Sequence, residues 1–358
     1  MKKFFISVIL SVLMLSVLSA YNPPAEGENF LELSSPRLLS NASSSCGGPI
    51  FYSSADSINV NAALPTSEQL IKINLAYTAL VSFNPSESHH FGSAMQTGII
   101  VPTKYCVFTG FLNGVLANFD SMNLGNSING KLGLSKEITN NINFGITLNS
   151  GVCWGNQTDW ALSTNLGLLC HFDTLGFIKD FRYGLAVNNI GKNYTATDLD
   201  FPINSNPSAE KSMFPTILTV RTGIAGLLLS TDSVKLGFSL DISTPLMQNI
   251  IIDGGIQLGI KDLFSITIAD RFNLAEYSNG HIDIIPSLGI SFKFSFRLDD
   301  NQLLRERGWE EINAEGSVAY KMLYEDVNAL SAGVDVSLGK RDVTPPVIQI
   351  FIDEGDDE

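Results

Sequence analysis

The chain has 358 residues, of which 16% are charged, and a formal net charge of -14. Its mean hydropathy of +0.16 and its few charges exclude a largely disordered chain, which needs low hydrophobicity and high charge. The excess of acidic residues excludes a general affinity for nucleic acid, because that requires clustered Lys and Arg.

The first twenty residues have the pattern of a secretory signal peptide. Lys2 and Lys3 precede an apolar run, 4–18, and the small residues Ser19 and Ala20 follow it. The run is too short for a comfortable transmembrane helix, so we expect cleavage and a mature chain that starts near residue 21. No other segment has about 18 uninterrupted apolar residues, and an exported chain of this kind can enter a membrane only as a closed β-barrel.

Residues 21–69 do not have the pattern of membrane-spanning strands or helices. They contain five prolines and a small polar run, 40–48. A segment of this length ahead of the first strand has the right size for a plug inside a wide barrel. The alternative is a disordered periplasmic leader.

Residues 70–340 alternate between apolar and polar side chains, and breakers such as Asn84-Pro85 and Asn279-Gly280 separate the runs. Connections after even-numbered strands are mostly short, whereas the linker 194–213 is long, which matches periplasmic turns and extracellular loops. The predicted fold is therefore all-β, an antiparallel transmembrane barrel of fourteen strands with an N-terminal plug. The strands are predicted at 70–83, 94–101, 104–119, 127–138, 141–154, 159–173, 181–193, 214–230, 233–245, 249–260, 263–275, 285–298, 315–325 and 327–339.

The segment 288–297, LGISFKFSFR, has the clearest alternation. Its leucine, isoleucine and three phenylalanines share one face, and Lys293 and Arg297 share the other. A secreted β-sandwich would bury the apolar face, whereas a membrane barrel turns it to lipid and its polar face to the lumen. The signal peptide, the fourteen strands without helices and the strand lengths favour the barrel.

Mid-strand charges fall on the polar face and are therefore expected in the lumen. The cations among them are Lys72, Lys131, Arg182, Arg221, Lys235, Arg271 and Lys293.

The segment 47–80 resembles the N-terminal region of FadL-type outer-membrane transporters. Asp56 and the run Asn61-Ala62-Ala63-Leu64 match the Asp and the Asn-Pro-Ala-x-Leu hatch motif of that family, except that Ala62 replaces the proline. The strand count and the plug also match. The resemblance implies a monomeric barrel that takes up long-chain fatty acids or similar hydrophobic molecules, holds them against the hatch and releases them sideways through the wall.

The resemblance makes these seven lumen Lys and Arg residues the candidate ligand-binding residues, which would pair with a carboxylate. An acyl tail would lie on inward leucines, namely Leu80, Leu112, Leu116 and Leu169. The family opens at its third strand. Glycines such as Gly110 and Gly114 in the strand 104–119 predict a bulge there.

The alternative function is a non-transporting FadL-related barrel that serves as a docking scaffold for proteins. No enzyme motif and no metal-like spacing of His or Cys is present, so neither a cofactor nor a metal is expected. The expected location is the outer membrane of a diderm bacterium, and the expected contacts are lipid and hydrophobic molecules. The end of the chain, 341–358, is predicted to be an acidic periplasmic tail with an apolar patch at 347–352.

Overall fold

The protein was analysed as a computed structural model. It describes residues 30–338, except for 41–43, 86–87, 118, 120–125, 155–157, 193, 195–217, 246, 248, 275–276, 278–285, 298–310 and 324–326. The predicted signal peptide and the acidic tail therefore lie outside the described residues.

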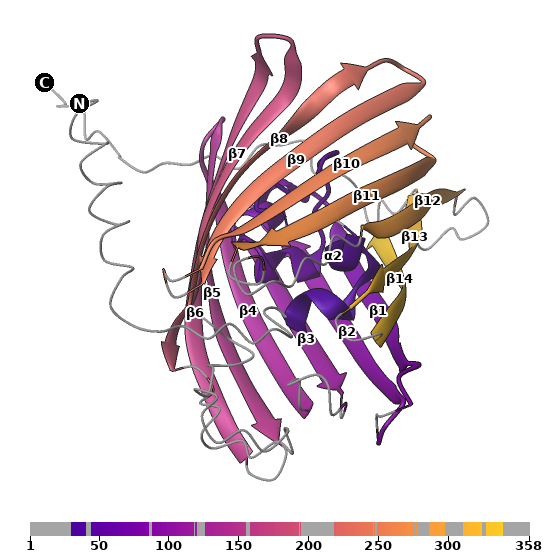
Figure 1. Ribbon diagram of the computed structural model, residues 1–358. Helices are drawn as coiled ribbons and strands as arrows, with labels where there is room; N and C mark the ends of the chain where they lie inside the picture. The colour runs from indigo at the N-terminus through magenta and orange to yellow at the C-terminus, as the bar shows by residue number, and fades with distance from the viewer. Residues whose placement is uncertain are drawn as a thin grey trace, which may run out of the picture.

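The described residues form one closed antiparallel barrel (Figure 1). Each strand pairs with its neighbours in sequence, and β1 closes the ring against β14, from Ile71 opposite Leu338 to Ser82 opposite Val327. The fourteen-strand all-β fold is thereby confirmed. The strands are β1 (Ile71–Ser82), β2 (Phe91–Pro102), β3 (Val107–Leu116), β4 (Asn126–Thr139), β5 (Ile142–Trp154), β6 (Thr158–Leu175), β7 (Ile178–Lys192), β8 (Thr219–Ser230), β9 (Val234–Pro245), β10 (Ile251–Ile260), β11 (Phe264–Asn273), β12 (Ser287–Arg297), β13 (Glu311–Met322) and β14 (Val327–Leu338).

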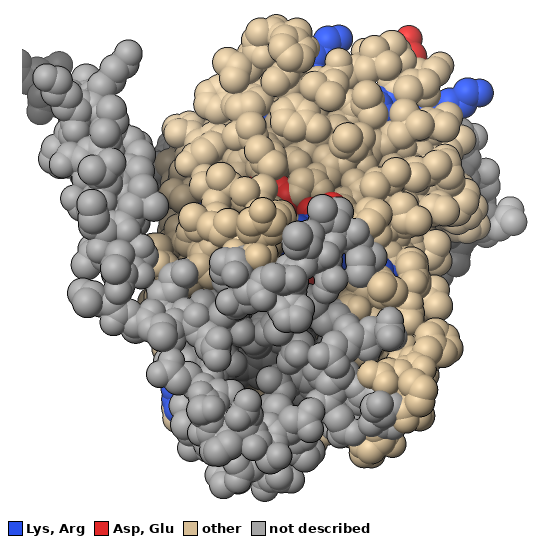
Figure 2. Space-filling model, in the orientation of Figure 1, with Lys and Arg blue, Asp and Glu red and all other residues tan. Residues whose placement is uncertain are grey.

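The two faces of the wall have the polarity of a membrane barrel. Leu288, Ile290 and Phe292 of β12 are 38–47% exposed on the outside, while Ser287 and Ser291 are buried on the inside. The wall seen in Figure 2 carries few charged side chains, some at its upper rim and others at the centre of the view. An apolar exterior of this extent is stable only against lipid.

The described residues of the range 30–69 lie inside the ring and carry four short helices (Figure 1). These are η2 (Phe30–Ser34), α2 (Pro36–Ser40), η3 (Ala55–Asn59) and η4 (Leu64–Ser67). We call the described part of this stretch the inner segment. Among the described residues, no helix is long and apolar enough to cross a bilayer.

The expected bulge in the third strand is absent. β3 keeps an unbroken register with both β2 and β4, so the wall is continuous there. Register shifts occur instead at the β4–β5, β6–β7, β7–β8 and β8–β9 pairings. The outward-facing Gly110 needs no distortion, because a Cβ added there would only touch the Ile99 side chain.

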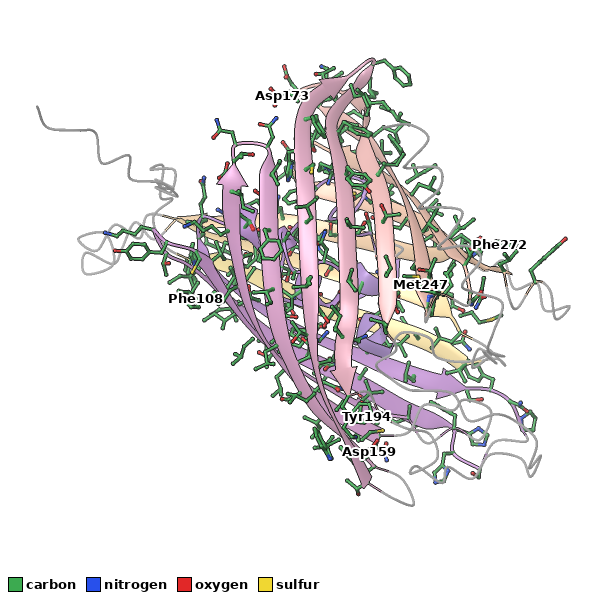
Figure 3. All side chains as sticks on the ribbon, turned by 90° about the vertical axis from the view of Figure 1, so that its left-hand side faces the viewer. Phe108, Asp159, Asp173, Tyr194, Met247 and Phe272 are labelled. Atoms are coloured by element: carbon green, nitrogen blue, oxygen red, sulfur yellow. The ribbon has the colours of Figure 1, made fainter. Side chains whose placement is uncertain are left out.

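The two ends of the barrel differ. In Figure 3, Asp173 marks the β6–β7 hairpin at one end, and Asp159 and Tyr194 lie at the other. The first end carries the start of β1, the end of β14 and the short turns after even-numbered strands, which identifies it as the periplasmic end. The opposite end is then extracellular.

We expect Leu132→Arg to destabilise the folded barrel by about 2–4 kcal/mol, because Leu132 is in the middle of the outer face of β4 and is 68% exposed. Tyr105→Arg is the matched control: Tyr105 is equally exposed but lies in the β2–β3 turn. Urea unfolding in lipid vesicles measures both. Equal stability of the two variants would mean that this face does not contact lipid.

Candidate functional site

The inner segment is held by a buried asparagine of the hatch-like motif. Asn61 Nδ2 donates to Ser45 O at 2.8 Å and to Leu168 O of β6 at 3.0 Å, while its Oδ1 accepts from Ala63 N at 3.0 Å. One side chain therefore joins two parts of the inner segment to the wall. Ala62, Ala63 and Leu64 are also buried.

The motif aspartate lies in a second buried network. Asp56 Oδ2 accepts from Ser35 and, at 3.0 Å, from Gln96 of β2. Nearby, Asp335 of β14 accepts from Ser54 at 2.7 Å. Burial raises the pKa of Asp56, and the neighbouring Asp335 carboxylate raises it further. The docked inner segment therefore favours the neutral form of Asp56.

Arg182 of β7 is fully buried and binds backbone rather than ligand. Its guanidinium donates to Cys46 O at 2.8 Å and to Pro49 O at 2.9 Å. Burial raises the pKa of the Cys46 thiol above its usual range, so this thiol is neutral while the inner segment stays in place.

Three more of the predicted cations form ion pairs in the lumen. Arg221 of β8 and Arg271 of β11 both bind Glu32 of η2, at 3.2 and 2.7 Å. Lys72 of β1 binds Glu68 at 2.8 Å and donates to Ser53 O. These contacts tie the inner segment to strands on opposite sides of the ring.

A stacked cluster completes this attachment. The Arg37 guanidinium of α2 lies 3.3 Å from the centre of the Tyr52 ring and forms an ion pair with Glu315 of β13. The Lys72 ammonium lies 4.6 Å from the same ring. Burial next to Asp335 raises the pKa of Tyr52 well above its usual value, so the phenol stays neutral.

Two predicted lumen residues lie at the periplasmic rim. Lys235 pairs with Asp262 in the β10–β11 turn at 2.8 Å, and its side chain is 34% exposed. The side chain of Lys293 is 54% exposed and lies 4.0 Å from Glu315. Both share the polar alternation of the inner face, but their strands extend far enough toward the rim for solvent to reach them.

Lys131 differs from the other six predicted cations. It faces inward from the middle of β4 and is 4% exposed, yet within the described part of the chain its ammonium has neither an ion pair nor a hydrogen bond. Its cross-strand neighbours are Phe111 and Asn149. A buried ammonium without an anion is costly, which makes this position receptive to an anionic group.

Two buried asparagines, one on β3 diagonal to Lys131 and one in η3, also have unused polar atoms. Asn113 faces inward on β3, two residues from Phe111, and neither its Oδ1 nor its Nδ2 has a partner. Asn59 ends η3, which packs against β3, and both its amide atoms are unpartnered as well. Buried polar atoms of this kind usually bind water or a ligand. We call Asn113 and Lys131 the polar site.

An apolar cluster borders the polar site on its extracellular side. Leu33 and Leu39 of the inner segment pack there against inward side chains of five adjacent strands. Val115 belongs to the cluster and lies two residues beyond Asn113 on β3. The wall contributes Leu80, Ala94, Val115, Ala117, Phe119, Ala319, Leu323, Val327 and Ala329.

The four leucines expected to face the lumen divide into two pairs. Leu80 and Leu169 are fully buried on the inside. Leu112 and Leu116 are 50% and 44% exposed on the outside, so their expected role against an acyl tail was wrong. The register of β3 turns Phe111, Asn113 and Val115 inward instead.

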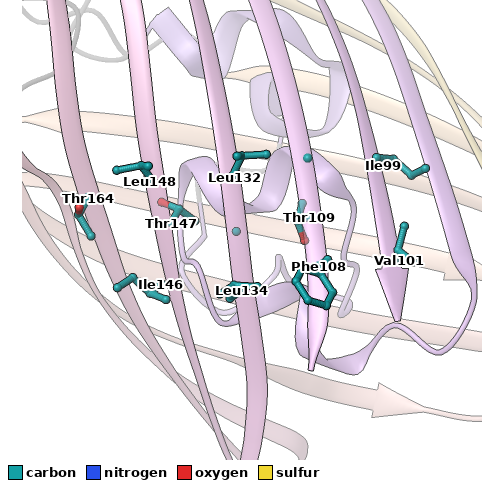
Figure 4. A pocket seen from close by; sticks show the side chains of 12 residues that line it. Ile99, Val101, Phe108, Thr109, Leu132, Leu134, Ile146, Thr147, Leu148 and Thr164 are labelled. Atoms are coloured by element: carbon teal, nitrogen blue, oxygen red, sulfur yellow. The ribbon is translucent and has the colours of Figure 1, made fainter. Parts of the chain in front are cut away.

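The outer wall carries an apolar groove of about 530 Å³ across β2–β6 (Figure 4). Phe108, Leu132 and Leu148 border it, and Gly110 leaves room in it. Because it opens on the lipid-facing side, it can hold an acyl or aromatic group. No cluster of His, Cys, Asp and Glu able to hold a metal occurs among the described residues.

Several important side chains were not anticipated from the sequence. Glu32, Arg37 and Asn59 lie in the inner segment, and Asn113 and Glu315 lie in strands. For Asn113, inward alternation beside the predicted Lys131 was a usable signal. For Glu32 and Arg37 no periodic pattern exists, because short irregular helices do not impose one.

No protein-family model matches the sequence, and no curated protein matches it. Solved structures do. The Ralstonia pickettii toluene transporter TbuX superposes with a TM-score of 0.50 at 10% identity, covering 88% of this chain and 98% of TbuX. Two further matches are the CymD monoaromatic hydrocarbon channel (TM-score 0.47, 10% identity, 88% and 99% covered) and the Pseudomonas putida toluene transporter TodX (0.45, 9%, 88% and 98%).

The chain has the FadL-type fold. TbuX is a fourteen-stranded transport barrel of this type, and its superposition extends over nearly its whole length. The fold predicted from the resemblance is therefore confirmed, and with it an architecture of the bacterial outer membrane.

The carboxyl group of Asp56 predicts a pH dependence. A released inner segment would restore the ordinary pKa of 3.8, whereas docking raises it, so docking weakens as the pH rises from 3.8 to the docked value. We expect maleimide to label Cys46 several-fold faster in the wild type than in Asp56→Asn above this window, and at equal rates below it.

Comparing the two proteins at each pH cancels the titration of the thiol itself. Asp232→Asn, in the exposed β8–β9 turn, is the control and should label like the wild type. A rate ratio between wild type and Asp56→Asn that does not change with pH would contradict the prediction.

Proposed function

We propose that the protein transports hydrophobic small molecules across the outer membrane, and that the inner segment is the hatch that closes its lumen. The FadL-type fold and the apolar cluster at the extracellular end support transport. The observation that carries the substrate preference is the lone Lys131 at the end of this cluster. We therefore propose long-chain fatty acids or similar amphipathic acids as substrates.

Close backbone contact supports the closed state. A Cβ built on Gly167 of β6 would lie 2.7 and 2.8 Å from the backbone nitrogens of Ala62 and Ala63. Gly145 of β5 approaches the same residues from the neighbouring strand. With Asn61 bonded to Leu168 O beside them, the hatch motif rests directly on the wall and leaves no room for a solute there.

The ion pairs in the lumen support different roles for Lys131 and for the other six predicted cations. Six of the seven predicted cations bind carboxylates, and four of these six bind a backbone carbonyl or a carboxylate of the inner segment, so all six are occupied in the resting state. Among these seven, only Lys131 can accept a new anion without breaking an existing pair. An incoming carboxylate would also take N–H bonds from Asn113, whose Nδ2 has no partner.

The apolar cluster can accommodate the acyl tail of the ligand. It continues from Asn113 to Val115 and on toward the extracellular end, so a molecule bound by its carboxylate at Lys131 would extend its tail outward. The cluster is packed by Leu33 and Leu39, so binding requires these two hatch side chains to move. Entry of a ligand would thereby loosen the hatch.

Gly167→Val should displace the hatch, because the new side chain would collide with Asn61, Ala62 and Ala63. We expect it to raise the single-channel conductance in planar bilayers and the uptake of a bulky polar antibiotic by at least several-fold. Heat-modifiable gel migration checks that the barrel still forms.

Gly254→Val is the matched control, since nothing lies within 4 Å of a Cβ at this outward position of β10. A folded Gly167→Val barrel with the low conductance of the control would rule out closure by the inner segment.

Lys131→Met should lower the affinity for oleate about tenfold or more, because a charge-assisted hydrogen bond contributes about 1.5–3 kcal/mol. The affinity for toluene should not change. Lys235→Met, at the rim, is the control and should keep both affinities. Equal losses for oleate and toluene would contradict a carboxylate at Lys131, and unchanged affinity for oleate would place the acid elsewhere.

A further inference from the structure

One strand of the closed wall has a free edge near the periplasm. β12 pairs with β11 only from Ser287 to Phe292, opposite Ala269 to Phe264. Directly after Phe292, Lys293 N still donates to Leu263 O at 2.8 Å; Leu263 lies in the turn that precedes β11. Residues 294–297 then pair with β13 alone, and no described residue pairs with their other edge.

The free edge is apolar and exposed. Phe294 and Phe296 are 53% and 56% exposed, and Leu263 in the adjacent turn is 57% exposed. Lys293 and Ser295, which alternate with them, are exposed too, so this part of β12 extends past the rim. An exposed strand edge of this kind is a template for another strand, and native proteins usually cover or protect it.

We propose that residues 347–352 of the C-terminal tail pair with this edge of β12 as an additional strand. Their sequence, VIQIFI, has four β-branched residues and one phenylalanine and contains no proline. Pro345 and Pro346 stand directly before it and limit pairing to this hexapeptide. Such a segment gains by pairing with an existing sheet edge, as in β-augmentation.

The tail begins within reach of the edge. Ser337 of β14 lies level with Asn313 of β13, which lies level with Ser295 of β12. Ser295 is therefore two strand spacings, about 10 Å, from Ser337. The nine residues from Leu338 to Val347 span up to about 30 Å, which is enough to pass around β13 and approach β12 from its far side.

Charge supports the antiparallel direction. In an antiparallel pair with β12, the hexapeptide ends toward the turn before β11, which carries the exposed Lys261. The acidic residues that follow, beginning with Asp353 and Glu354, would then lie near Lys261 and Lys293. The parallel direction would send these acids away from both lysines. A second copy of β12 on this edge would bring a second Lys293 instead of an acid.

Hydrogen exchange of the full chain in nanodiscs, followed by mass spectrometry, tests this pairing. In the wild type we expect the amides of 347–352 to exchange at least tenfold more slowly than in Ile350→Pro, which cannot pair. The 293–297 amides should exchange faster in the same variant. Val343→Pro, in the tail but before the hexapeptide, is the matched control and should leave both segments protected.

The proposal is overturned if the hexapeptide of the wild type exchanges at the rate of a free peptide. It is also overturned if Ile350→Pro leaves the 293–297 amides unchanged, because the edge would then be covered by something else.

A cross-link identifies the source of the strand. With the four native cysteines replaced by alanine, Ser295→Cys and Ile350→Cys together should form a disulfide within one chain. Disulfide-linked dimers in its place would mean that a second copy supplies the strand, which overturns pairing within the chain.

Discussion

The constraint on which this structure depends is that every backbone N–H and C=O at membrane depth must have a partner within the protein. Closing β1 onto β14 meets it, since all fourteen strands then have two neighbours. The wall of this closed barrel has the opposite polarity to a soluble protein: apolar side chains face lipid, and Lys, Arg, Asp and Asn face inward. The polar and charged side chains that line the lumen therefore need hydrogen-bond and ion-pair partners inside the barrel.

The inner segment supplies these partners. Glu32 binds Arg221 and Arg271, Arg37 binds Glu315, and the carbonyls of Cys46 and Pro49 accept from Arg182. Each contact gives a charged group of the wall a partner in the inner segment, which is a strong reason for the segment to remain inside. Lys131, with Asn113 near it, is not satisfied in this way, and the proposed function rests on that difference.

The alternation of side chains allowed the strands and their faces to be predicted, because the period of two is local to each strand. The lumen position of Lys72, Arg182, Arg221 and Arg271 was recoverable in the same way. Their partners were not, since Glu32 and Pro49 lie more than a hundred residues from the arginines they bind. Leu112 and Leu116 were misplaced because β3 has large apolar side chains on both faces, Phe108 outside and Phe111 inside, so its pattern does not indicate which side faces lipid.

The sequence by itself determined the barrel: its strand number, its antiparallel order, its lipid-facing exterior and the segment ahead of β1 that resembles a hatch. These follow from periodicity and turn residues, which act over a few residues of chain. Only the tertiary structure decided which lumen cations are occupied, that β3 is continuous and that β12 has a free edge. Those features depend on strand register and on contacts between distant segments, and the pattern of neighbouring residues in the sequence does not indicate either.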